Sequence, residues 1–220
     1  MCELYLETVT PTLYRILQIL MKDEMFTPFC LVGGTSLSLR MGHRKSVDID
    51  LFTSAEYKTI DFQLLQQRLR KVFPICQGEC GDIVGMGTSY MIGFEYGDLI
   101  KLDLYYTEPF ISPMEIVDGI RLASVEDIVA MKLEAIGNGG RKKDFWDIHE
   151  LRKQYPLAQM LELYRERYPY SYSKHEILYA LENFNQADSM PDPKCLLKKS
   201  WPFIKMDLYN WVEQYKQNNK

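Results

Sequence analysis

The segment LVGGTSLSLRMGHRKSVDIDLFT, residues 31–53, decides how the N-terminal half of this chain folds. A short apolar run over residues 29–32 stops at Gly33-Gly34, which predicts a buried strand that enters a turn. A strand, a glycine turn and a helix start bring free backbone N–H groups together with no side chain in the way, and that arrangement suits a phosphate group. Many strand-to-helix turns contain glycine for geometry alone, so the turn by itself leaves both interpretations open.

The second part of the segment predicts a short helix and another strand. Thr35 is expected to cap a helix that runs to Leu39 and is closed by Gly42. Residues 47–52, VDIDLF, alternate between apolar and polar side chains with a period of two, which predicts a strand.

Asp48 and Asp50 are the candidate functional residues of this strand. Residues two apart on a strand point to the same side, so Val47, Ile49 and Leu51 are expected to face the core while both aspartates project from the other face. Two carboxylates this close repel each other unless a cation lies between them, and a divalent ion such as Mg²⁺ is the natural partner. The alternative is a pair of solvated aspartates on an exposed sheet face.

A third aspartate follows in a later strand. The alternating pattern over residues 89–106 predicts a β-hairpin that turns at Gly97-Asp98. In its second strand, Asp103 lies on the polar face together with Lys101. Asp103 joins the first two aspartates if the two strands are neighbours in the sheet. Three carboxylates on an open sheet face, opposite a glycine turn, would make a two-metal site for phosphoryl transfer.

The remaining segments have apolar residues at helical spacing, and several begin with a recognisable cap. The predicted helices follow Thr10, span 62–72, follow Ser124, lie within 142–154, follow a capping box at 173–176 and span 201–215. We therefore predict an α+β fold with a mixed sheet and flanking helices in residues 1–118, followed by a helical C-terminal domain over 119–220.

Composition limits the class of protein. The 220 residues are 46% hydrophobic and 25% charged, which is typical of a soluble globular protein. The formal net charge of −4 argues against a protein that coats nucleic acid by charge alone, and Arg44-Lys45, Arg141–Lys143 and Lys198-Lys199 are expected to be solvated surface. The sequence has neither the pattern of a signal peptide nor an apolar run of about 18 residues, so we expect a cytoplasmic protein with no membrane partner.

The order and spacing of these motifs resemble a known family. Gly33-Gly34-Thr35, a spacer of twelve residues and then Asp48-x-Asp50 resemble motif I of the DNA polymerase β-like nucleotidyltransferases. Within that superfamily, the segment is similar to the abortive-infection toxins of the AbiEii/AbiGii type.

Two further motifs extend the resemblance. IKLDLYY, residues 100–106, matches the position of the family's third carboxylate. ASVEDIVAMKLEAIGNGGRKKDFWDIHEL, residues 123–151, resembles its lysine motif and the aspartate motif that follows. The similarity covers about residues 31–151, and the C-terminal third carries no recognised motif.

The resemblance implies roles for individual residues. Asp48, Asp50 and Asp103 would act in catalysis and hold Mg²⁺ or Mn²⁺ as the cofactor, and the glycine turn with Thr35 would bind the NTP substrate. These nucleotide-binding residues of the turn are Gly33, Gly34 and Thr35.

The same resemblance implies roles for three residues of the helical half, which would complete the active-site cleft. The ammonium of Lys132 would reach the triphosphate or neutralise the leaving group, Asp144 would lie in the cleft, and Asp147 would help to bind the nucleotide. The alternatives are that Lys132 extends to solvent from an apolar helix face, and that both aspartates form salt bridges with the basic run at Arg141–Lys143.

The function implied is a nucleotidyltransferase that moves a nucleoside monophosphate from an NTP, ATP or GTP, to an acceptor and releases pyrophosphate. A toxin of this family would modify tRNA or a protein and would be restrained by a separately encoded antitoxin. Two alternatives remain open: a non-catalytic nucleotide- or RNA-binding module on the same fold, and a nucleotidyltransferase that modifies a small molecule such as an antibiotic.

Other candidate residues favour simpler interpretations. His43 lies in a basic loop and His149 on a charged helix, so surface positions are expected for both. The fifteen tyrosines match no nucleic-acid-binding motif, and structural or semi-exposed packing is expected for them. Cys76 and Cys80 form a lone C-x3-C pattern, which is weak as a metal signal, so reduced thiols are expected. The sequence contains neither a P-loop nor a strand–GxGxxG–helix motif.

Overall fold

Strands from the N-terminal half form one mixed sheet. The computed structural model describes residues 3–81 and 85–219, and in this part of the chain seven strands are arranged in the order β3-β4-β5-β2-β1-β7-β6. The bounds of the strands are β1 Cys30–Leu31, β2 Asp48–Thr53, β3 Ile75–Gln77, β4 Gly87–Gly93, β5 Ile100–Tyr106, β6 Glu115–Val117 and β7 Ile120–Leu122. The β2–β5 and β1–β7 pairs are parallel and the other neighbours are antiparallel, so the predicted mixed sheet is confirmed.

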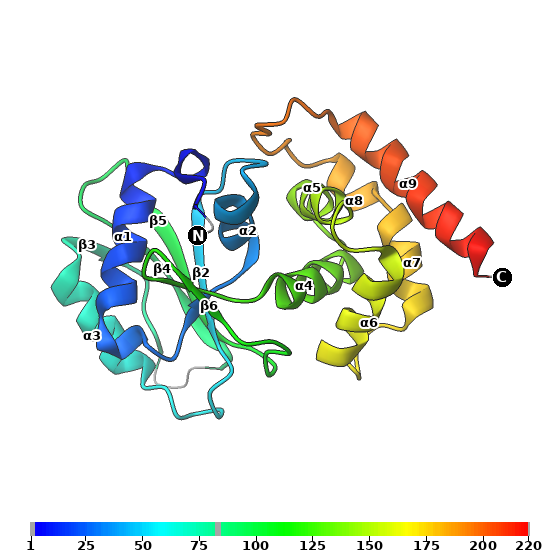
Figure 1. Cartoon of the computed structure of the whole chain (residues 1–220). Helices are drawn as coiled ribbons and strands as arrows, with labels where there is room; N and C mark the ends of the chain where they lie inside the picture. The colour runs from blue at the N-terminus through cyan, green and yellow to red at the C-terminus, as the bar shows by residue number, and fades with distance from the viewer. Residues whose placement is uncertain (1–2, 82–84, 220) are drawn as a thin grey trace. The chain divides into compact units, whose positions relative to one another are not determined.

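The α-helices that flank this sheet are α1 Pro11–Lys22, α2 Gly33–Met41 and α3 Phe62–Val72. The predicted cap of α1 is confirmed, because the Thr10 hydroxyl accepts a hydrogen bond of 3.1 Å from the N–H of Leu13. Figure 1 shows α1 and α3 on one face of the sheet and α2 on the other. Short 3₁₀ turns occupy Leu6–Thr8 and Glu24–Phe26.

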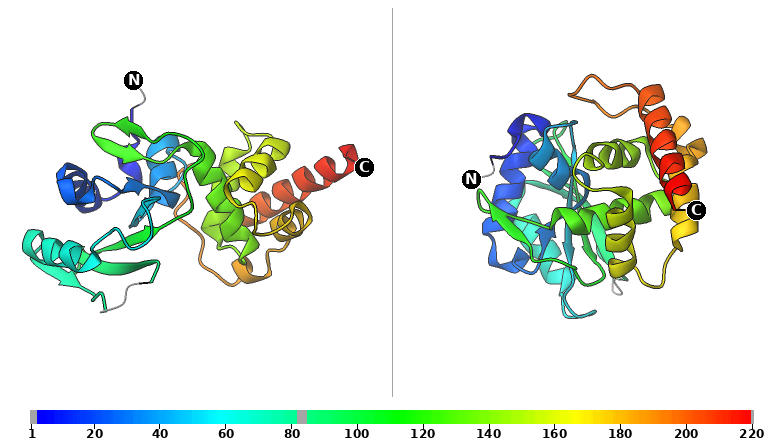
Figure 2. Two further views of the ribbon diagram at one scale, coloured as in Figure 1. Left: turned by 90° about the horizontal axis from the view of Figure 1, so that it is seen from below. Right: turned by 45° about the vertical axis from the view of Figure 1, so that its right-hand side comes forward.

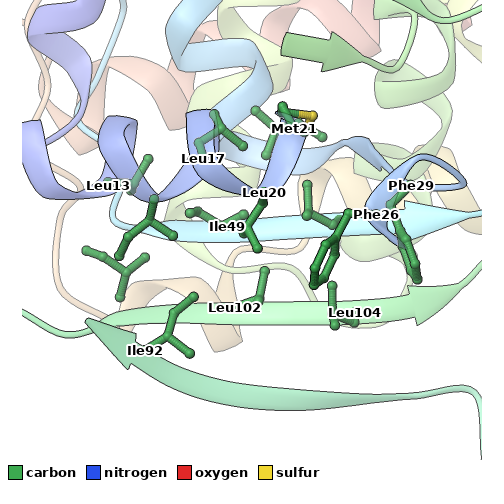
Figure 3. Packing of buried hydrophobic residues seen from close by; sticks show 14 of the residues in the cluster. Leu13, Leu17, Leu20, Met21, Phe26, Phe29, Ile49, Ile92, Leu102 and Leu104 are labelled. Atoms are coloured by element: carbon green, nitrogen blue, oxygen red, sulfur yellow. The ribbon is translucent and has the colours of Figure 1, made fainter. Parts of the chain in front are cut away.

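The apolar face of the sheet packs against α1. Leu13 and Leu17 of the helix lie over Ile49 of β2 and Leu102 of β5 (Figure 3), and all four side chains are fully buried. Full burial of one such side chain stabilises the fold by about 1.5–3 kcal/mol. This packing fixes which face of β2 and β5 is turned to the core, and therefore which face carries the aspartates.

The C-terminal half is helical, as predicted. Its helices are α4 Val125–Gly137, α5 Lys142–Leu151, α6 Leu157–Arg167, α7 Lys174–Glu182, α8 Asn185–Asp188 and α9 Trp201–Asn218. Helix α4 packs against α5, α6 and α7, and α9 packs against the same three (Figures 1 and 2). Ser124 caps α4, and the predicted capping box joins Ser173 and Glu176 at the start of α7.

The chain divides into two units, each with parts that are separate in sequence. Unit 1 comprises Met1–Met41, Ser46–Pro109 and Pro113–Ala123, and unit 2 comprises Gly42–Lys45, Phe110–Ser112 and Ser124–Lys220. The predicted boundary after residue 118 falls inside the β6–β7 hairpin, whose second strand pairs with β1, so the sheet unit extends to Ala123. In the described part of the chain, no helix has the length and apolar character needed to cross a membrane.

Candidate functional site

The three predicted aspartates lie on one face of the sheet in unit 1. Ile49 and Leu51 of β2 are fully buried, whereas Asp48 and Asp50 point to the opposite side. In the parallel β2–β5 pair, Asp50 lies directly opposite Asp103. The prediction that β5 brings a third carboxylate beside the first two is therefore confirmed.

Val47 departs from the predicted pattern. It was expected to face the core with Ile49, but its side chain is 61% exposed. The reason is that β2 begins at Asp48, so Val47 precedes the ladder that fixes the direction of the side chains.

The glycine turn lies against the second aspartate. The N–H of Val32 donates a 2.9 Å hydrogen bond to the carbonyl oxygen of Asp50, which holds the end of β1 beside β2. Gly33 follows with a φ of +67°, and a Cβ atom on it would lie only 2.8 Å from Oδ2 of Asp50. Glycine is thus required at position 33 by both its backbone conformation and the space available. These constraints explain the glycine without a phosphate, and phosphate binding stays a prediction.

Thr35 does not cap a helix as predicted, because α2 already begins at Gly33. Its buried hydroxyl is within 2.8 Å of the Ser46 Oγ and donates to the carbonyl oxygen of Asp48. The residue therefore fixes the start of β2, and its hydroxyl is committed to the protein.

A lysine accompanies the carboxylates. Asp103 accepts hydrogen bonds from the Ser89 hydroxyl at 2.6 Å and from the Lys101 ammonium at 2.5 Å. Partial burial lowers the pKa of Lys101, but the hydrogen bond and charge of Asp103, with the charges of Asp50 and Asp48, raise it above its ordinary value. The ammonium thus offsets part of the carboxylate repulsion that led us to predict a metal.

The set of donors matches a divalent cation in its chemistry, since three carboxylates share one sheet face. The three carboxylates are not arranged around a common point where a metal could bind, because Asp103 is directed to Ser89 and Lys101. Among the described residues, no group of three or more His, Cys, Asp or Glu side chains is placed to hold a metal ion. Metal binding by the aspartates therefore stays a prediction.

The other three predicted site residues form a buried cluster in unit 2. The ammonium of Lys132 lies 2.7 Å from Asp144 and 2.7 Å from Asp147. Burial lowers the pKa of Lys132, but the charges of Asp144 and Asp147 raise it above its ordinary value. The expected alternative in which Lys132 extends to solvent is wrong, because its side chain is 7% exposed.

Asp147 is the centre of this cluster. It accepts two hydrogen bonds of 2.7 Å from the guanidinium of Arg44, and its Oδ1 is 2.8 Å from Nε2 of His43. Burial raises the pKa of Asp147, but the charges of Arg44 and Lys132 outweigh this effect and hold the pKa well below its ordinary value. Its carboxylate is fully buried among these protein partners, so the geometry gives no support to a direct contact with nucleotide.

Asp144 joins the cluster to the start of α5. One carboxylate oxygen accepts from Lys132, and the other accepts a 3.0 Å hydrogen bond from the N–H of Arg141. The predicted salt bridge with the basic run is present between Asp144 and Arg141, at 3.6 Å. Lys142 of the same run pairs with Asp192 instead.

The surface positions expected for His43, Arg44 and His149 are wrong. The residues Gly42–Lys45 are part of unit 2, where Arg44 is 2% exposed because its charge is matched by Asp147. His149 is buried as well: its Nε2 lies 2.8 Å from Asp207, and its Nδ1 lies 3.0 Å from the Lys199 ammonium. Burial is the main cause of its lowered pKa.

Comparison with known proteins assigns the chain to a family. A family model described as "Nucleotidyl transferase AbiEii toxin, Type IV TA system" matches residues 15–210. The chain belongs to the AbiEii family. The resemblance seen in the motifs is thereby confirmed, and the AbiEii match extends through most of the C-terminal third, where no motif was recognised.

Individual proteins and solved structures are also similar to this chain. An uncharacterized protein of Aquifex aeolicus (strain VF5) is 33% identical over 147 residues, which span 64% of this chain and 66% of that protein, just under two thirds of its length. The nucleotidyltransferase toxin MenT4 of Mycobacterium tuberculosis H37Rv has a TM-score of 0.58 at 13% identity, covering 90% of this chain and 80% of that one. JHP933 from Helicobacter pylori has a TM-score of 0.55 at 20% identity, covering 94% and 92%. The AbiEii chain thus has the nucleotidyltransferase fold that the motifs predicted.

Proposed function

We propose that this AbiEii protein transfers a nucleoside monophosphate from an NTP to an acceptor and releases pyrophosphate. The observation that carries the proposal is the contact between the glycine turn and the aspartates: Gly33 packs on Asp50, and Asp50 lies opposite Asp103. A backbone turn beside clustered carboxylates suits a reaction in which phosphate oxygens and metal ions must meet at one point.

Asp48, Asp50 and Asp103 would hold Mg²⁺ or Mn²⁺ in this proposal. The bound metal would stabilise charge on the phosphates and lower the pKa of the attacking hydroxyl. Two hydroxyl side chains of the protein hold these aspartates in position. Thr35 anchors the backbone of Asp48, and Ser89 orients the carboxylate of Asp103.

For Lys132, Asp144 and Asp147, the contacts support a positioning role. The two aspartates hold the ammonium of Lys132 in place, and Arg44 balances the charge of Asp147. The contact with the triphosphate that the family resemblance implies for Lys132 would require its ammonium to leave one of these carboxylates. We keep Lys132 and Asp144 as candidates for catalysis on the family resemblance. Asp147 is assigned the role of holding these two side chains in position.

The acceptor in this proposal is RNA, with tRNA as the first case to test and a protein as the second. The family description places AbiEii proteins in type IV toxin–antitoxin systems. We therefore propose that transfer is toxic to the host cell and that a separately encoded antitoxin restrains it.

The test is transfer of label from each α-labelled NTP, with Mg²⁺ and total tRNA, followed by separation of labelled RNA from labelled protein. Asp50→Asn should lower transfer at least about 100-fold, because catalysis of phosphoryl transfer depends on charge stabilisation at the phosphates. Asp118→Asn is the matched control, since Asp118 is an exposed aspartate in the β6–β7 turn. Equal transfer by Asp50→Asn and the control would refute the assignment of the site.

One observation favours a second candidate function. Lys101 already pairs with Asp103, and its ammonium can contact a phosphate group without metal. A non-catalytic nucleotide- or RNA-binding module would bind the NTP or RNA and label no acceptor, even as wild type. Binding without transfer in every reaction of the test would therefore support this module over the transferase.

A further inference from the structure

The loop between α6 and α7 presents aromatic side chains to solvent. Residues 168–173 have the sequence YPYSYS, and Tyr170 within them is 99% exposed. Tyr179, in the second turn of α7, is 66% exposed. The expected structural or semi-exposed packing does not describe Tyr170, whose side chain is almost wholly in solvent. An exposed aromatic ring offers a flat face on which a partner can stack.

Two cavities flank this loop, and both lie within unit 2. The first has a volume of about 530 Å³ and is lined by residues that include Tyr168, Tyr215, Arg165 and Lys174. The second has a volume of about 480 Å³, and its lining includes Tyr179, His175 and the amides Asn183, Asn185 and Gln186. Each volume lies in the range that takes a small organic group such as a nucleoside.

Tyr172 forms a wall of both cavities. Its hydroxyl lies 3.0 Å from Oδ1 of Asn138, and its backbone N–H donates to the Tyr164 hydroxyl at 3.1 Å. A Cβ atom on Gly137 would lie 2.6 Å from its ring, so the ring packs closely on α4. The ring is therefore fixed before any ligand arrives, which lowers the entropic cost of stacking on it.

The lining of the first cavity carries two cationic side chains, Arg165 and Lys174, and two anionic ones, Glu162 and Glu176. Lys174 lies over the ring of Tyr215 at 5.0 Å. Glu176 is occupied with the cap of α7, where it accepts from the N–H and hydroxyl of Ser173. Glu162 is the second anionic side chain of the lining. Unit 2 as a whole contains 17 Lys and Arg against 14 Asp and Glu, so it is positive in a chain whose net charge is −4.

We propose that the α6–α7 loop and its two flanking cavities bind a single-stranded segment of RNA. Bases would stack on Tyr170, Tyr172 and Tyr179, the amides beside Tyr179 would hydrogen-bond a base edge, and Arg165 and Lys174 would pair with phosphates. A duplex hides the faces of its bases, so the ligand is an unpaired end or loop. The inference rests on the proposed function only in taking this RNA to be the acceptor.

The first experiment measures binding alone. Fluorescence anisotropy with a labelled 12-nucleotide single-stranded RNA, the full chain and neither NTP nor Mg²⁺ should give saturable binding. Tyr170→Ala and Tyr179→Ala should each weaken binding by about fivefold or more, as removal of a stacking ring does. Both side chains are exposed, so neither change should affect folding. Tyr209→Ala is the matched control, because Tyr209 is 49% exposed on α9 and lines neither cavity.

Charge variants test the same surface in opposite directions. Arg165→Gln and Lys174→Gln should weaken binding and reduce its salt dependence. The slope of log affinity against log salt should change by about 0.7 for each pairing with a phosphate that the substitution removes. Glu162→Gln should strengthen binding, because it removes one of the two opposing charges on the lining. No saturable RNA binding by the wild type, or equal binding by the tyrosine variants and Tyr209→Ala, would overturn the proposal.

Label transfer separates this inference from the proposed function. RNA binding that depends on Tyr170 and Tyr179, without transfer by the wild type, supports the binding surface and counts against the transferase. Transfer to RNA with an unchanged KM for RNA in both tyrosine variants supports the transferase and overturns the binding surface. Loss of labelling of a protein acceptor in the tyrosine variants, without RNA binding, would assign the surface to a protein partner and overturn the inference.

Discussion

A Cβ atom at position 33 would lie 2.8 Å from Oδ2 of Asp50. Real Cβ atoms do not approach an oxygen this closely, so Gly33 and Asp50 constrain each other. The glycine allows the backbone turn to rest on the carboxylate, and any larger residue there must move that carboxylate. The glycine turn and the aspartate strand of the segment 31–53 therefore depend on each other for their positions.

We expect Gly33→Ala to damage the site more than the fold. An alanine at a φ of +67° costs about 1–2 kcal/mol of strain, and its methyl group also displaces Asp50. Gly119→Ala is the matched control, because Gly119 has a φ of +78° with no atom within 4 Å of the added Cβ. Both variants should lose similar stability in urea unfolding, while only Gly33→Ala should lose Mg²⁺ affinity in calorimetry and NMP transfer. Equal Mg²⁺ affinity in the two variants would contradict the role of this contact.

Lys101→Met should increase the affinity for Mg²⁺ by about two- to fivefold, the range expected for release of a partly exposed ion pair. The reason is that Lys101 now pairs with Asp103, and a metal must displace it to use that carboxylate. Without metal, the variant should melt at a lower temperature than the wild type, because three carboxylates would lose a neighbouring cation.

The measurement for Lys101 is titration calorimetry with Mg²⁺, accompanied by thermal unfolding with and without the metal. Lys71→Met serves as the control, since Lys71 is an exposed lysine in the last turn of α3. An unchanged affinity in Lys101→Met would mean that Asp103 does not take part in metal binding.

Asp147→Asn should destabilise unit 2 by about 3–5 kcal/mol, the usual cost of leaving buried charges without their partner. Arg44 would remain buried without its carboxylate, and Lys132 would keep only Asp144. All three tryptophans, Trp146, Trp201 and Trp211, belong to unit 2, so tryptophan fluorescence in urea reports on its unfolding. Asp192→Asn, which removes an exposed partner of Lys142, should cost less than about 1 kcal/mol.

The pH dependence of stability should also depend on the cluster around Asp147. Because the folded state holds the pKa of Asp147 well below the ordinary 3.8, its contribution to stability is complete above that pH and is lost as the pH falls through the folded value. The wild type should therefore lose stability below about pH 3.8 more steeply than Asp147→Asn does. Parallel curves for the two proteins would contradict the assignment.

His149 should produce a second pH dependence at milder acidity. Burial keeps its pKa below the ordinary 6.5, so the unfolded chain binds a proton more readily than the folded protein. Stability from His149 is thus complete above pH 6.5 and falls as the pH drops through the folded value. His149→Gln should show a smaller change in its urea midpoint between pH 7.5 and 5.5, while His175→Gln, at an exposed position, should behave as the wild type. Equal changes in all three proteins would exclude His149 as the source.

Local sequence patterns were enough to predict that Asp48, Asp50 and Asp103 lie on one face of the sheet. The alternation in β2 and β5 fixes which side chains leave the core, and the caps at Thr10, Ser124 and Ser173 mark helix starts through contacts within three residues. What the sequence could not show depends on distant partners. Arg44 and His43 were expected in a solvated loop because Asp147 lies more than 100 residues further along the chain.

The pairing of Lys101 with Asp103 was within reach of the sequence, since both lie on the same face of one strand. The pattern alone could not decide whether the lysine would extend into solvent or turn back to the carboxylate. The end of the sheet unit at Ala123 depends on a distant partner in the same way: β7 is only three residues long, and its place in the sheet depends on pairing with β1.

The residues Gly42–Lys45 have a consequence for how this protein can evolve. They are the N-terminal piece of unit 2, yet the residues on either side of them belong to unit 1. A recombination event that exchanged only residues 124–220 would deliver Asp147 and Lys132 without Arg44 and His43. The incoming helices would carry an unbalanced buried charge cluster, and the hybrid would fold poorly. Residues 124–220 therefore cannot be exchanged between proteins on their own. They must be inherited together with Gly42–Lys45, which are encoded some eighty codons upstream.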